Sequence, residues 1–186
     1  PLLPDLECST TTFAHLLSSF FGADMPKQDY EGLKRQLMDA PSGDCSPQGL
    51  ELRGLVSSHR DWIGMDRVRL AIEHQWRQLF KQWDVVVCPV LPTTASFHDH
   101  SAMDDRRIDI DGRSVPYKAQ AAWMSVASVA GLPATTMPIG LCAAGLPVGV
   151  QLIGPYLEDR TSIRFAELVE REFGGFVVPP MFGPGV

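Results

Sequence analysis

Apolar residues recur at helical spacing through most of the first 83 positions of the chain. Ser and Thr fill positions 9–12 and favour helix N-caps, whereas Gly22 is typical of a helix end. The apolar residues between them share one face, which we expect to be buried: Phe13, Leu16, Leu17 and Phe20. A second short helix is expected to bury one face and to close at residues 40–41; its face comprises Tyr30, Leu33 and Leu37.

A longer helical pattern follows a loop at residues 41–49. It extends from Leu50 to Trp83 and carries charged side chains opposite its apolar face. Trp76 and Trp83 are seven positions apart, which places them on the same face of a helix. We therefore predict that both tryptophans belong to the core.

From residue 84 onward the pattern indicates strands. Residues 84–90, DVVVCPV, form a continuous apolar run that is typical of a strand buried on both faces. A polar loop is expected at 93–105, and Asp111-Gly112 predicts a type I′ hairpin turn. A helix of small residues at 118–133 and strands at 134–139 and 147–153 complete this part.

A last amphipathic helix is predicted at 158–173. Asp159 is its expected cap, Gly174-Gly175 its end, and its inward residues are Ile163, Ala166, Val169 and Phe173. The order of elements predicts an α/β fold with a mixed β-sheet flanked by helices. We interpret residues 1–186 as a single or partial domain, with 1–83 mainly helical and 84–186 supplying the strands.

The composition argues against some classes of partner and indicates the state of the cysteines. The formal net charge is -6 and no run of basic residues occurs, which argues against a nucleic acid partner. The longest apolar stretches are too short to span a bilayer, so no membrane partner is expected. Four widely spaced cysteines without a CxxC pair favour free thiols and a cytoplasmic location. The first residue is Pro1, so we expect a chain cut from a longer one.

Four short sequence motifs in the second half of the chain are similar to those of a known family. Residues 131–133 read GLP, 138–140 read PIG, and 145–154 read GLPVGVQLIG before Glu158-Asp159. Upstream, residues 84–95 read DVVVCPVLPTTA. In this order the blocks resemble the C-terminal region of the amidase signature family, over about residues 50–180. The resemblance implies the C-terminal part of an amidase-signature fold.

The resemblance also implies a function. Members of this family cleave amide bonds with a Ser nucleophile, a second Ser and a Lys, which lie in an N-terminal Ser- and Gly-rich signature. No such stretch occurs here, and no lysine lies in a matching motif. We therefore expect no catalytic residue in this chain and no activity of the chain alone. Its parent protein is expected to hydrolyse a small amide, without a cofactor.

Candidate pocket residues come from the half beyond the signature, which in this family supplies part of the substrate pocket. They are Trp123, His98, Asp99 and His100. His98 and His100 could alternatively be polar loop residues or two ligands of a metal, although a zinc site needs a further ligand that the sequence does not indicate. Arg106 and Arg107 could clamp a carboxylate or form a solvated pair beside the hairpin.

Two further hypotheses remain open. The scaffold could serve as a non-catalytic binding or interaction module, or as an amidotransferase-type subunit working with partners on charged tRNA. If the chain is one part of a larger sheet, its strand edges and an apolar face lack their cover. We then expect self-association or exposed hydrophobic surface.

Overall fold

The computed structural model describes residues 3–41, 44 and 47–179. The chain divides into two compact units. The first comprises Pro1–Leu79 and Ser125–Gly131, and the second comprises Phe80–Met124 and Leu132–Val186.

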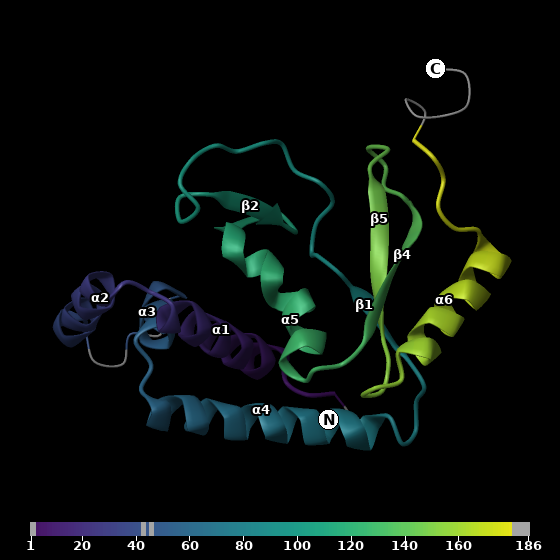
Figure 1. Cartoon of the computed structure of the whole chain (residues 1–186). Helices are drawn as coiled ribbons and strands as arrows, with labels where there is room; N and C mark the ends of the chain where they lie inside the picture. The colour runs from purple at the N-terminus through teal and green to yellow at the C-terminus, as the bar shows by residue number, and fades with distance from the viewer. Residues whose placement is uncertain (1–2, 42–43, 45–46, 180–186) are drawn as a thin grey trace. The chain divides into compact units, whose positions relative to one another are not determined.

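Helices build the first unit (Figure 1). They are α1 (Leu6–Ala23), α2 (Lys27–Asp39), α3 (Pro47–Leu55) and α4 (His59–Leu79). Helix α1 packs against α3 and α4, and α2 packs against α3. Part of the loop predicted at 41–49 lies outside the described residues, and α3 already begins within it.

The start of α1 differs from the prediction. The N-cap is Asp5, whose carboxylate accepts a hydrogen bond from the Cys8 amide at 2.7 Å. Ser9 and Thr12 lie inside the helix and are buried. The hydroxyl of Ser9 donates to the carbonyl oxygen of Asp5, four residues back, which lets a cap-type residue occupy a helix interior. The predicted apolar face is also wrong in part, because Phe20 is 65% exposed.

The predicted long helix is two helices, and a capping box explains the break. The Ser58 amide donates to the Asp61 carboxylate at 3.3 Å, and the Asp61 amide donates to the Ser58 hydroxyl at 3.2 Å. This reciprocal pair starts α4 and stops the helical pattern from running through residues 56–58. Trp76 of α4 is 1% exposed, as predicted, but Trp83 lies beyond the end of α4 and is 58% exposed.

A three-stranded sheet is the centre of the second unit. Its strands are β1 (Val86–Pro89), β4 (Ala134–Leu141) and β5 (Pro147–Ile153), in the order β1-β5-β4 with antiparallel neighbours. Its buried residues are Met137 of β4 and Gln151, Leu152 and Ile153 of β5. Strand β1 has one neighbour among the described strands and alternates in burial, with Val87 52% exposed, so the prediction of two buried faces is wrong.

Glycines shape the β4–β5 pair. The register shifts between Pro138 and Gly140, where Gly140 has a φ of 140°. On the opposite strand, a Cβ at Gly149 would lie 3.1 Å from the carbonyl oxygen of Met137. The first glycine thus accommodates a bulge and the second allows close backbone approach.

The hairpin comprises β2 (Arg107–Ile110) and β3 (Arg113–Pro116). Its two-residue turn is Asp111-Gly112, with φ angles of 52° and 77°. Type I′ turns require positive φ at both central positions, so the sequence prediction agrees with the structure. The short helix η1 (Tyr117–Ala121) follows, and α5 (Ala122–Val129) continues from it.

Helix α6 (Asp159–Phe173) lies along β4 and also contacts β5 (Figure 1). Ser162 faces the sheet, where its hydroxyl lies 2.9 Å from that of Thr135. The predicted inward face is wrong for Ile163 and Phe173, which are 57% and 81% exposed, because no described segment covers them. The N-cap is Glu158 rather than Asp159, and its side chain makes no capping bond.

The hydropathy of the helices and the state of the cysteines can also be read from the structure. No described helix combines the length and apolar character needed to cross a bilayer. Cys8, Cys88 and Cys142 are free thiols, whereas Cys45 lies outside the described residues. Burial raises the pKa of the Cys88 thiol, so this thiol stays protonated and unreactive at neutral pH.

Candidate functional site

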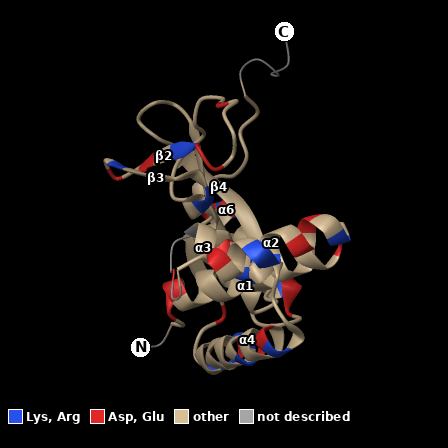
Figure 2. Cartoon of the chain, turned by 90° about the vertical axis from the view of Figure 1, so that its left-hand side faces the viewer, with Lys and Arg blue, Asp and Glu red and all other residues tan. Residues whose placement is uncertain are grey.

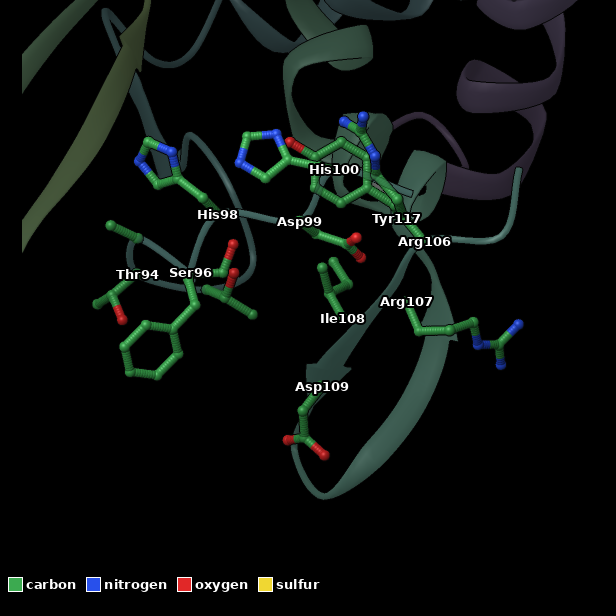
Figure 3. A pocket seen from close by; sticks show the side chains of 13 residues that line it. Thr94, Ser96, His98, Asp99, His100, Arg106, Arg107, Ile108, Asp109 and Tyr117 are labelled. Carbon is green, nitrogen blue, oxygen red and sulfur yellow. The ribbon is translucent and has the colours of Figure 1, made fainter. Parts of the chain in front are cut away.

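The loop after β1 and the β2–β3 hairpin enclose a hollow of about 670 Å³ within the second unit. Residues 93–100, 106–109 and Tyr117 line it (Figure 3). Three residues predicted from the sequence, His98, Asp99 and His100, lie together on its wall. All three are exposed to solvent.

Asp99 is held by its own loop. The hydroxyl and the amide of Ser101 donate to one carboxylate oxygen of Asp99, at 2.7 and 2.9 Å. These bonds from the Ser101 side chain and backbone, together with the charge of Arg106, hold the pKa of Asp99 below its usual value. The carboxylate is therefore a fixed negative acceptor at neutral pH.

The two neighbouring arginines take different places. Arg106 donates from Nε to the Ser101 carbonyl oxygen at 2.9 Å, and its guanidinium carbon lies 6.0 Å from the centre of the Tyr117 ring. Arg107 instead donates across the hairpin to the hydroxyl and carbonyl oxygens of Ser114. Figure 3 shows its guanidinium pointing away from the histidines. The arrangement therefore does not support a two-arginine carboxylate clamp.

The two histidine rings lie side by side, with centroids 6.2 Å apart and planes inclined by 59°. Within the described part of the chain, no three His, Cys, Asp or Glu side chains are grouped so that they could hold a metal ion. Each imidazole can donate or accept a hydrogen bond, depending on its tautomer.

Trp123 does not line this hollow. It lies in the first turn of α5 and is half-buried, and its carbonyl oxygen accepts a hydrogen bond from Gln151 Nε2 at 2.9 Å. The same nitrogen donates to the Pro89 carbonyl oxygen at 2.9 Å. Gln151, which is 5% exposed, thus joins the end of β1 to the start of α5.

Sequence reasoning missed two features of this region. The motif GLPVGVQ contains Gln151, but nothing local indicates that its amide bonds two carbonyl groups far away in the chain. Arg106 was considered only as part of a pair, whereas its contacts are with Ser101 and Tyr117. A single signal was available, since Asp99 and Ser101 have the spacing of an Asx turn.

The chemistry of the hollow suits a small polar group. The Asp99 carboxylate accepts, the Arg106 guanidinium donates, and the two imidazoles do either. An amide presents N–H donors and a carbonyl acceptor, which these side chains complement. Figure 2 shows acidic and basic residues interspersed on the hairpin and on α2 and α4, so the described surface carries charges of both signs.

Comparison with known proteins identifies the family. The family model described as Amidase matches residues 6–163. A glutamyl-tRNA(Gln) amidotransferase subunit of an Exiguobacterium species is 32% identical over 115 residues, which is 62% of this chain and 22% of that protein. Fatty-acid amide hydrolase 2-A of Danio rerio is 27% identical over 169 residues, which is 91% of this chain and 29% of that protein.

A solved structure has the same fold. An amidase crystal structure superposes with a TM-score of 0.64 at 21% identity, over 91% of this chain and 36% of that one. This likeness confirms the predicted α/β class and the amidase-signature fold. The chain spans about a fifth to a third of the length of these curated relatives. With a family model matching most of its residues, the chain belongs to the amidase family.

Proposed function

We propose that this chain forms part of a hydrolase that cleaves the C–N bond of a small amide. In this proposal the chain supplies the sheet of its second unit and one wall of the substrate pocket, including His98, Asp99 and His100. The nucleophile and its catalytic partners come from outside residues 1–186. The chain alone is therefore inactive toward amides, and the whole enzyme needs no cofactor and acts in the cytoplasm.

The family match over residues 6–163 is the observation that carries the proposal. Two features support its details. The sequence has no Ser- and Gly-rich stretch of the kind that bears the nucleophile in this family. The hollow beside the hairpin offers acceptors and donors that complement an amide, with Asp99 and Arg106 held in place by Ser101.

Exposed apolar side chains are consistent with a missing cover. Phe97 is 99% exposed, Phe173 81% and Leu157 76%, in a unit whose strands β1 and β4 each have one neighbour among the described strands. Apolar surface of this kind is usually covered by another part of a protein or by a partner. The chain in isolation is therefore expected to self-associate.

A second candidate function is that of one subunit in an amidotransferase. The match to the glutamyl-tRNA(Gln) amidotransferase subunit favours it. In this case the pocket would serve an enzyme that acts on charged tRNA with partner subunits. The net charge of -6 predicts that such a tRNA would be held by the partners and not by this chain.

The test compares two polypeptides on a panel of primary amides, anilides and glutamine, by the release of ammonia or amine. One polypeptide is the 186-residue chain, and the other is the full product of the reading frame that contains it. We expect turnover only from the longer one. Steady turnover by the purified chain would refute the assignment of the nucleophile. Ammonia release from glutamine alone would favour the amidotransferase reading.

A further inference from the structure

A serine and a histidine meet in the first unit, which is separate from the unit that holds the hollow described above. Ser57 Oγ lies 3.0 Å from His15 Nε2. His15 belongs to α1, whereas Ser57 lies in the turn between α3 and α4, 42 positions later in the chain. This distance lies within the range expected for a nucleophile and its general base.

The surroundings of His15 keep it neutral. Burial lowers the pKa of its imidazole, and the negative charge of Asp61 partly opposes this effect. At neutral pH the ring is therefore uncharged. When its ring proton is on Nδ1, its Nε2 can accept the hydroxyl hydrogen of Ser57, in competition with the Ser58 carbonyl oxygen, which lies 3.4 Å from the same hydroxyl. Asp61 is fixed near the start of α4 by the Ser58 hydroxyl at 2.5 Å. Its charge favours the imidazolium that forms when the base takes a proton.

The serine also opens onto a space. A second hollow, of about 340 Å³, is lined by Ser57 together with Ser19, Gly22, Met25, Tyr30 and Leu55. This volume is at the lower end of the range for small-molecule sites. The lining combines apolar carbon with hydroxyl groups and includes Lys27. A short acyl chain could therefore lie beside the Ser57 oxygen.

We propose that Ser57 and His15 form a second nucleophilic site, which takes an acyl group from esters of small carboxylic acids. Ser57 Oγ attacks the ester carbonyl carbon while its proton passes to His15 Nε2. The bond from that carbon to the alcohol oxygen breaks, and the alcohol leaves with the proton. Water then attacks the acyl-serine by the same exchange and releases the acid.

The proposal does not depend on the amidase chemistry, because its nucleophile lies within residues 1–186. The test uses diisopropyl fluorophosphate, on which Ser57 Oγ forms a bond to phosphorus, fluoride leaves and the proton passes to His15. Both the 186-residue chain and the full polypeptide are treated, and the modified serine is located by peptide mass spectrometry. Peptide mapping separates label on Ser57 from label on a serine elsewhere.

Ser19 is the matched control, because it lines the same hollow and its hydroxyl donates to the Leu16 carbonyl oxygen instead of to a histidine. We expect Ser57 to react at least about 100-fold faster than Ser19, and His15→Gln to remove that advantage. Equal rates at the two serines, or an unchanged rate in a folded His15→Gln variant, would overturn the proposal.

The pH dependence of the unmutated chain provides a test that needs no variant. A base whose pKa lies below the usual histidine value of about 6.5 predicts that the labelling rate at Ser57 is already level between about pH 7.5 and 9. A rate that instead rises about tenfold per pH unit from about 6 to 9 would show a hydroxyl ionising without a base. That outcome would also overturn the proposal.

Discussion

Helix α1 contacts α3 at a place where one glycine has no room for a side chain. A Cβ built on Gly22 would lie 1.8 Å from the carbonyl oxygen of Leu55. Real Cβ atoms essentially never approach a neighbour more closely than 3.0 Å. In Gly22→Ala the two helices must therefore separate by more than about 1 Å, and the neighbouring atom cannot rotate away because it belongs to the backbone.

The expected cost follows from two opposing terms. Overpacking of this kind costs about 1–3 kcal/mol or more. Alanine in place of glycine recovers up to about 1 kcal/mol of helix propensity, and less near a helix end. The steric term dominates, so Gly22→Ala should lower the free energy of unfolding by about 2 kcal/mol. For a chain of this size, that corresponds to a melting temperature lower by about 4–8 °C.

The assay is thermal unfolding followed by circular dichroism in the far ultraviolet, at low protein concentration. Two matched controls are Gly32→Ala in α2 and Gly64→Ala in α4, because a Cβ at either position meets nothing within 4 Å. Each control should leave the stability unchanged or raise it by about 0.5–1 kcal/mol. A second test site in the same interface is Gly54, where a Cβ would lie 2.6 Å from that of Ser18.

One result would refute this reasoning. If Gly22→Ala melted at the same temperature as Gly64→Ala, the close approach of α1 and α3 would not exist in solution. A loss confined to Gly22→Ala, with Gly54→Ala unaffected, would instead restrict the tight contact to the end of α1.

Three other predictions concern single side chains. Gln151→Leu leaves the carbonyl oxygens of Pro89 and Trp123 without their donor. The free energy of unfolding, measured in urea, should therefore fall by about 1–3 kcal/mol. An unchanged urea midpoint would contradict the double hydrogen bond. Ser58→Ala removes the capping hydroxyl of α4 and should cost about 1 kcal/mol in the same assay, whereas Ser101→Ala, in an exposed loop, should cost less. Because burial lowers the pKa of His15 in the folded chain, the unfolded chain binds its proton first. Stability should therefore fall as pH drops below about 6.5, the usual histidine value, and His15→Gln should flatten that part of the profile.

Several elements follow directly from short stretches of the sequence. The Asp111-Gly112 turn, the strands of the GLPVGVQLIG block and the final helix depend on neighbouring residues, because turn chemistry and periodic patterns are local. The order of four motif blocks indicated the amidase family for the same reason. Trp76 was also correctly predicted as core, since its spacing with other apolar residues of the same helix marks the buried face.

Tertiary structure decided what no local pattern contains. Trp83 and Phe173 have the periodicity of core residues, yet they are exposed, because burial requires a second surface and no described segment supplies one. His98 and Asp99 lie in a hollow that the hairpin completes, whereas Trp123, predicted with them, lies outside its lining. Contacts between distant positions depend on the path of the chain, and hydrogen bonds such as those of Gln151 therefore emerge only once the strands and helices have packed.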